Sequence, residues 1–184
     1  MKVLTVLGTR PEAIKLAPVI AALEAAPEIE SRVCVTGQHR EMLEQMLGVF
    51  RIAPDHDLAL MRPCQSLSEI AGRALAALDR VIGAEAPDRV LVHGDTTTAM
   101  AAALAAFHRR VPVGHVEAGL RTGDLSRPWP EEANRRVIDA VADQLYAPTA
   151  RARDNLMAEN LGARRIVVTG NTVIDALGTA RERL

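Results

Sequence analysis

The chain has 184 residues, with 22 Lys and Arg against 23 Asp and Glu, so its formal net charge is −1. Hydrophobic residues make up 48% and charged residues 24%, which is typical of a folded globular domain and excludes a disordered chain. The balanced charge gives no support to a nucleic-acid or anionic-membrane partner, and an aromatic content of 2% argues against stacking platforms for bases or sugars.

Short apolar runs alternate with helical patterns along the whole chain. Runs rich in Val, Leu and Ile predict strands at 3–7, 32–36, 89–93, 111–116, 144–147 and 165–169. Apolar residues at helical spacing predict helices at 13–25, 40–50, 67–82, 97–108, 131–142, 150–160 and 173–184. Near-continuous apolar strands are typical of parallel strands covered on both faces. We therefore predict one α/β domain over residues 1–184, with a doubly wound parallel sheet.

The cysteines and the apolar runs bear on the compartment. Cys34 and Cys64 are too few for a disulfide framework, and Cys34 lies in an apolar run. The first apolar run is too short for a signal peptide, and no run reaches the roughly 18 residues of a membrane span. We expect a cytoplasmic, reducing environment.

The first strand-to-helix turn carries two cations. Thr9 and Glu12 match a capping box at the start of a helix, and this structural role accounts for both residues. Arg10 and Lys15 are unfavourable near a helix N-terminus unless an anion binds there, as phosphates commonly do. The turn is therefore a candidate phosphate site, although ordinary surface charge also accounts for the two cations.

Three carboxylates lie in the segments that follow the predicted strands. Asp95 follows the third predicted strand, where it is either a general base or a helix cap. Glu117 follows the fourth strand, either as a group with a shifted pKa or as an ion-pair partner of Arg121 or Arg10. Glu131 begins a helix, where the dipole favours an acid, and its spacing permits a pair with Arg135. Ligands of such sheets bind at the carboxyl ends of the strands, so we expect one site there.

Three histidines lie near the predicted site, and each gives a weaker indication of function than the carboxylates. His39 begins a predicted helix, where a solvent-facing or capping role is more common than catalysis. His93 and His115 occupy strand ends, but no spacing typical of metal ligands appears, so we predict no metal site. The sequence also contains no Gly-x-Ser-x-Gly nucleophile elbow and no recognisable Ser/His/Asp set.

Six segments in order along the chain carry a family resemblance. They are GTRPEAIK (8–15), QHREML (38–43), VHGDTTT (92–98), GHVEAGLRTG (114–123), PWPEEANR (128–135) and TGNTVIDAL (169–177). Together they resemble the non-hydrolysing UDP-N-acetylglucosamine (UDP-GlcNAc) 2-epimerases. The resemblance covers the whole chain but only the N-terminal half of the family pattern.

The resemblance implies a fold and a reaction. It implies a Rossmann-like domain that forms the N-terminal half of a two-domain glycosyltransferase-B architecture, with the C-terminal UDP-binding domain absent here. The implied reaction interconverts UDP-GlcNAc and UDP-N-acetylmannosamine (UDP-ManNAc): UDP leaves with loss of the C2 proton, giving 2-acetamidoglucal, and then adds back with the opposite configuration. No cofactor is implied, and the implied assembly is a homodimer.

The resemblance also assigns residues by position. The implied catalytic residues are Asp95, Glu117, Glu131, Arg10 and Lys15. The expected substrate-binding residues are Gly8, Thr9, His93, Thr96 and Arg135. Gln38 and His39 match a region that binds a second UDP-GlcNAc as an allosteric activator in some members.

Two other functions fit the same residues. One is a hydrolysing relative that releases UDP and ManNAc, which product analysis distinguishes from an epimerase. The other is a non-catalytic module that binds a sugar nucleotide or mediates dimerisation. With the second domain absent, we expect this chain alone to show no epimerase turnover and weak UDP binding.

Overall fold

A parallel sheet forms the centre of the computed structural model, which describes residues 1–37, 40–162 and 164–183. Its strands are β1 (Lys2–Leu7), β2 (Glu30–Val35), β3 (His56–Asp57), β4 (Arg89–His93), β5 (Val113–Val116), β6 (Gln144–Ala147) and β7 (Arg165–Val168). The spatial order is β3-β2-β1-β4-β5-β6-β7. From β1 the chain adds strands β2 and β3 on one side, and from β4 onward it adds strands on the other side, so the strand order reverses between β1 and β4. Such a reversal opens a crevice at the carboxyl ends of the strands, which is the usual ligand position in this class of fold.

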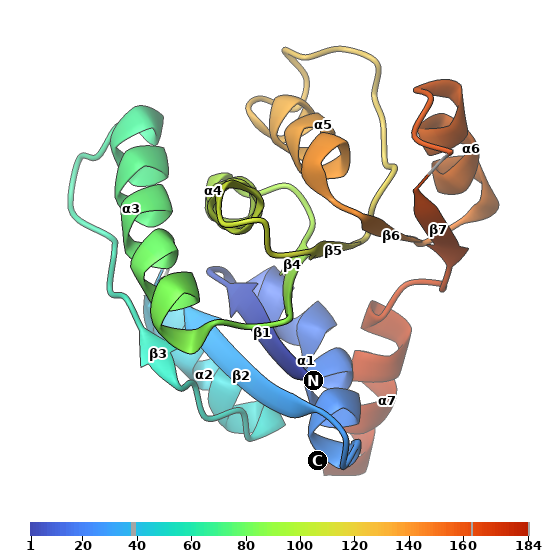
Figure 1. Ribbon diagram of the computed structural model, residues 1–184. Coiled ribbons are helices and arrows are strands. Elements are labelled where there is room, and N and C mark those ends of the chain that lie inside the picture. Colours follow the sequence, from blue (N-terminus) through green and yellow to red (C-terminus); the bar gives the residue numbers. More distant parts are fainter. Residues whose placement is uncertain (38–39, 163, 184) are drawn as a thin grey trace.

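Helices cover both faces of the sheet. They are α1 (Arg10–Ala25), α2 (Arg40–Phe50), α3 (Leu67–Glu85), α4 (Thr97–His108), α5 (Glu131–Val141), α6 (Ala150–Ala158) and α7 (Val173–Arg183). Figure 1 shows α3, α4, α5 and α6 on one side of the sheet and α1, α2 and α7 on the other. The predicted Rossmann-like, doubly wound α/β fold is confirmed.

Two apolar clusters, one on each face of the sheet, form the core. Along β1, Leu4 and Val6 belong to the cluster beneath α3 and α4, while Leu7 belongs to the cluster beneath α1 and α2. This division follows from the alternation of side chains along a strand, which points successive residues to opposite faces. Burial on both faces explains why the strands are nearly continuous apolar runs.

The predicted elements differ from the observed ones at a few boundaries. All six predicted strands are present, but the prediction missed β3, which has only the two residues His56 and Asp57 and no apolar pattern. Helix α1 begins at Arg10 instead of residue 13, because Thr9 is already its N-cap. The strand predicted from residue 111 begins at Val113.

Strand register brings several loops to one edge of the sheet. His93 pairs with Val116, and the Gly94 N–H donates to the Val116 carbonyl over 3.0 Å. The turns after β4 and β5 therefore lie side by side, next to the turn after β1. This edge, formed by the carboxyl ends of the strands, is called the carboxyl edge below, and the opposite one the amino edge.

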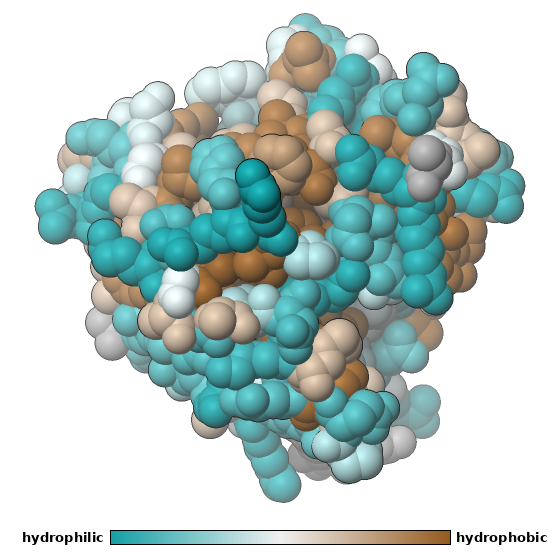
Figure 2. All heavy atoms as spheres, in the orientation of Figure 1, coloured by the Kyte–Doolittle hydropathy of each residue, from teal (hydrophilic) through white to brown (hydrophobic). Residues whose placement is uncertain are grey.

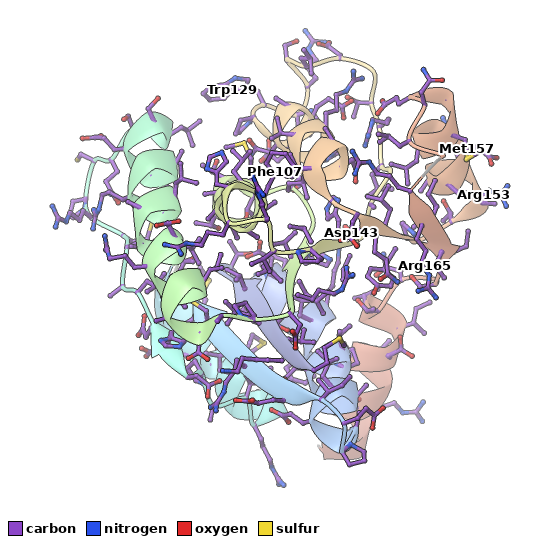
Figure 3. The ribbon with its side chains drawn as sticks, in the orientation of Figure 1. Phe107, Trp129, Asp143, Arg153, Met157 and Arg165 are labelled. Atoms are coloured by element: carbon purple, nitrogen blue, oxygen red, sulfur yellow. The ribbon has the colours of Figure 1, made fainter. Side chains whose placement is uncertain are left out.

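The amino edge holds a separate hollow between the ends of α4 and α5. Figure 2 shows hydrophilic residues over much of the visible face, with hydrophobic residues gathered in a recess near its centre. A cavity of about 540 Å³ has Phe107 and Asp143 among its lining residues, and both are labelled in Figure 3. No helix in the described part of the chain has the length and apolar character needed to cross a membrane.

Candidate active site

A pocket of about 300 Å³ opens at the carboxyl edge. Its lining residues are Thr9, Pro11, Glu12, Lys15, His93, Gly94, Asp95, Thr96 and Glu117. They come from the turns after β1, β4 and β5 and from the first turns of α1. Six residues singled out from the sequence thus surround one cavity: Thr9, Lys15, His93, Asp95, Thr96 and Glu117.

The capping box at the start of α1 is present and shapes the floor of this pocket. Glu12 is 2% exposed, and its Oε2 accepts from the backbone N–H groups of Gly8 (2.8 Å) and Thr9 (2.7 Å). Its Oε1 accepts from the Thr96 hydroxyl over 2.8 Å. The structural role predicted for Glu12 is therefore confirmed, and the same carboxylate ties the turn after β1 to the turn after β4.

Gly8 allows this turn to pack tightly. A Cβ at position 8 would clash with the Thr36 hydroxyl and lie 2.8 Å from the Thr98 hydroxyl. A glycine is therefore required by the close approach of two side chains, and Gly8 itself does not line the pocket.

Glu117 and Lys15 form the central ion pair of the site. Lys15 Nζ lies 2.8 Å from Oε1 and 2.6 Å from Oε2 of Glu117, so neither Arg121 nor Arg10 is the partner. Asn171 Nδ2 donates to Oε2 over 3.1 Å, and His93 Nε2 lies 3.6 Å from the same oxygen. Burial raises the pKa of Glu117, but His93 and Lys15 together outweigh this effect and lower the pKa to about 2. The group is thus held as a carboxylate.

Asp95 lies beside this pair and is held from α5. The Arg135 guanidinium bonds its Oδ2, and Asn134 Nδ2 donates to its backbone carbonyl over 2.9 Å. Arg135 therefore does not make the suggested pair with Glu131, because its guanidinium is turned to Asp95 and Glu132 instead. The N-cap of α4 is Thr96, so Asp95 is not the helix cap.

Some buried polar atoms near the pocket have no hydrogen-bond partner among the described residues. They include both ring nitrogens of His93, Oε2 of Glu131 and Nε of Arg135. Glu131 is the first residue of α5, one turn before Arg135 on the same side of the helix. Buried polar groups are normally satisfied, so such a set indicates a place where water or a ligand binds.

The other predicted residues are placed differently. Arg10 is exposed at the start of α1 and does not line the pocket. Gln38 and His39, the region matched to an allosteric site, lie outside the described residues. Arg135 reaches the site from α5 through its contact with Asp95, and neither Arg135 nor Glu131 lines the cavity.

Two asparagines contribute contacts that the sequence interpretation did not assign. Asn134 holds the Asp95 carbonyl, and Asn171 bonds Glu117. Both lie inside two of the six segments that carry the resemblance, PWPEEANR and TGNTVIDAL, so their position in these segments was the available signal.

The described residues include no group of three or more His, Cys, Asp and Glu side chains placed to hold a metal ion.

A family model described as UDP-N-acetylglucosamine 2-epimerase matches residues 21–184. The chain belongs to this family. As a family member it is 60% identical over its full length to the UDP-N-acetylglucosamine 2-epimerase of Salmonella typhimurium and 58% identical to that of Escherichia coli K12. It covers 49% of each, so this epimerase-family chain spans about half the length of the curated relatives it matches.

Solved structures agree with this family assignment. A UDP-GlcNAc 2-epimerase from Neisseria meningitidis bound to UDP-GlcNAc superposes with a TM-score of 0.97 at 55% identity, covering 100% of this chain and 50% of the other. The Methanocaldococcus jannaschii epimerase in complex with UDP-GlcNAc and UDP gives 0.90 at 39% identity, covering 96% and 48%. A lipopolysaccharide outer core galactosyltransferase, at 16% identity and a TM-score of 0.66, covers 93% and 46% and shares the fold alone.

Proposed function

We propose that this chain supplies one half of the active site of a UDP-GlcNAc 2-epimerase, which interconverts UDP-GlcNAc and UDP-ManNAc by elimination and re-addition of UDP. The Lys15–Glu117 pair carries the proposal, because it lies beside Asp95 and His93 in a pocket at the carboxyl edge. Two of the relatives named above are seen with UDP-GlcNAc, which supports this choice of substrate.

The pocket suits the two charges that develop in this reaction. The hydrogen at C2 is not acidic, so cleavage of the C1–O bond leads and leaves positive character on the sugar. Glu117, held ionised, stabilises that charge. Lys15 and the N-terminus of α1 favour the departing diphosphate, because helix N-termini attract phosphate.

The three carboxylates differ in what they can do. Glu117 is a poor proton acceptor, because its pKa is about 2. Asp95 is engaged by Arg135. Glu131 keeps a buried oxygen that has no partner among the described residues. We assign the proton transfer at C2 to Glu131 and charge stabilisation to Glu117 and Asp95. Arg10 is exposed at the start of α1, and we propose that it contacts the diphosphate. The residues proposed to bind the substrate around it are Gly8, Thr9, His93, Thr96 and Arg135.

The proposal includes a second domain and a second subunit. We propose that the uridine contacts come from a C-terminal domain, and that the protein works as a homodimer in the cytoplasm. Phe107, near the end of α4, is 54% exposed, which favours a subunit contact there. The two cysteines are free, as expected in a reducing compartment.

The test uses the chain alone and a joined protein, in which this chain is followed by the C-terminal half of the Salmonella typhimurium relative. With UDP-GlcNAc, the joined protein is expected to form UDP-ManNAc, and the chain alone is expected to form none. Release of UDP and free ManNAc would favour the hydrolysing alternative. Binding of UDP-GlcNAc by the folded joined protein without any product would favour the non-catalytic module.

A further inference from the structure

A buried charged network contacts the two turns that carry Asp95 and Glu117 and takes no part in the chemistry proposed above. His115 and Asp139 are both 0% exposed, and His115 Nδ1 lies 2.6 Å from Asp139 Oδ1. Arg121 Nη2 lies 2.8 Å from Asp139 Oδ2 and also pairs with Glu159 of α6. Burying charged groups is costly, so a network of this kind is kept for a specific contact that apolar residues could not make.

One arm of the network reaches the turn that carries Asp95. His115 Nε2 lies 2.7 Å from the carbonyl oxygen of Gly94, the residue between His93 and Asp95. A carbonyl oxygen only accepts, so Nε2 must donate to it. The imidazole of His115 thus connects the Asp139 carboxylate to the turn after β4.

The other arm reaches the turn that carries Glu117. The Gly119 N–H donates to Asp139 Oδ2 over 3.2 Å, two residues after Glu117. The Gly119 carbonyl accepts from Asn155 Nδ2 over 2.9 Å, and a Cβ at position 119 would clash with the Ala152 carbonyl. The turn is therefore fixed from two sides, by Asp139 of α5 and by the first turns of α6.

Glu117 needs this fixation because its backbone is strained. Its φ is +68°, a left-handed conformation that is unfavourable for a residue with a side chain and persists only where the surroundings hold it. The same conformation aims the carboxylate at Lys15 and Asn171. A small release of the turn would move Glu117 away from both.

We infer that Asp139, acting through His115 and the Gly119 amide, is a positioning residue that holds the turns of Asp95 and Glu117 in one arrangement. The inference rests on the proposed function for its catalytic meaning. Asp139 takes donors on both oxygens, from His115, Gly119 and Arg121. An asparagine of the same size can accept on one oxygen only and turns an NH₂ group toward a donor, so Asp139→Asn is a close probe of this role.

The first test uses the 184-residue chain and needs no substrate. The NMR shift of the Glu117 carboxyl carbon reports whether this group is ionised. In the wild type, the carboxyl group is expected to stay ionised down to about pH 3, because the Lys15 contact persists. In Asp139→Asn, the released turn loses Lys15 and His93, and Glu117 is expected to titrate above about pH 4. A folded Asp139→Asn chain whose Glu117 titrates as in the wild type overturns the inference.

The matched control is Asp143→Asn, which removes a carboxylate from the exposed pair with Arg89 and leaves Glu117 unchanged. If Asp139→Asn does not fold, a measurement on the wild-type chain tests the inference instead. Asp139 is held as a carboxylate, because His115 and Arg121 lower its pKa more than burial raises it. The Gly119 N–H then donates to a charged oxygen, and its hydrogen is expected to exchange slowly with solvent. Fast exchange of this amide hydrogen in the folded wild type would overturn the inference.

The second test measures turnover in the joined protein. Asp139→Asn is expected to lower kcat on the order of 100-fold with KM nearly unchanged, because misplacing the reacting groups affects the chemical step more than substrate binding. Asp143→Asn is expected to change neither. Wild-type turnover of folded Asp139→Asn would contradict this inference alone. An inactive wild-type joined protein would contradict the proposed function, and the NMR test would still decide the positioning role.

Discussion

The two edges of the sheet treat their polar groups in opposite ways. At the amino edge, charged side chains form exposed pairs. Two of them are Arg89–Asp143 (2.9 Å) and Arg32–Asp55 (2.7 Å). At the carboxyl edge, in the part of the chain that the structure describes, buried atoms of His93, Glu131 and Arg135 have no hydrogen-bond partner.

This difference separates stability from function. An exposed ion pair contributes little to the free energy of unfolding, and forming it requires little desolvation, so it can lie wherever surface charge is useful. A buried polar atom without a partner lowers stability unless a bound molecule or water satisfies it. The carboxyl edge keeps such atoms next to a strained Glu117, which is the arrangement expected of a ligand site.

The largest expected effect is on turnover at the carboxyl edge. Glu117→Gln keeps the size of the side chain but removes the charge that faces the developing positive sugar. In the joined protein we expect kcat to fall about 1000-fold, measured by UDP-ManNAc formation. Glu24→Gln, an exposed substitution in the same helix as Lys15, is the control. Wild-type turnover in Glu117→Gln would remove the main distinction between the two edges.

The next largest effect is on stability. Lys15→Met removes the cation from Glu117, whose side chain is 13% exposed, and leaves a buried carboxylate without its main partner. We expect the free energy of unfolding of the chain to fall by about 3 kcal/mol, measured by urea denaturation at neutral pH. The double variant Lys15→Met/Glu117→Gln has no such charge and should recover much of the loss. Equal stabilities of the single and double variants would contradict this explanation.

The sequence predicted the carboxyl edge because the rules that govern it are local or topological. Apolar runs identify parallel strands, strand ends converge at one edge, and Thr9 with Glu12 forms a capping box that needs only its own turn. These rules were enough to gather Lys15, Asp95 and Glu117 around one pocket.

The choice of partners could not be predicted in the same way. Glu117 pairs with Lys15 across 102 residues of sequence, although Arg121 is nearer along the chain. Arg135 turns to Asp95 instead of its helical neighbour Glu131. Such choices depend on how α1 and α5 lie against the sheet. Strand β3 was missed for a related reason, since its two residues follow the pairing of β2 and not a pattern of their own.

Acid should weaken the carboxyl edge through Glu117. Its pKa is lowered from an ordinary 4.5 to about 2, so its contribution to stability is present above about pH 4.5 and is lost as the pH falls through 2. After screening by solvent, we expect this loss to be about 2 kcal/mol, measured as the free energy of unfolding from pH 5 to pH 2. The loss of unfolding free energy over the same pH range should be smaller by about 2 kcal/mol in Glu117→Gln than in the wild type. Asp139 also has a lowered pKa, but it contributes equally to both chains. Parallel curves for the two chains would contradict the role given to Glu117.

The smallest effect belongs to the amino edge. Asp143→Asn breaks a pair in which both Arg89 nitrogens bond the carboxylate at 2.9 Å, but the Asp143 side chain is 47% exposed, so water replaces the lost contacts. We expect the free energy of unfolding to change by less than about 1 kcal/mol, and the difference to shrink further in about 1 M salt, which screens exposed charges. The same salt should leave the cost of Lys15→Met nearly unchanged, because that pair is shielded from solvent. An Asp143→Asn variant as destabilised as Lys15→Met would show that the amino edge, too, depends on its charges, and the contrast between the edges would then rest on the unpartnered atoms alone.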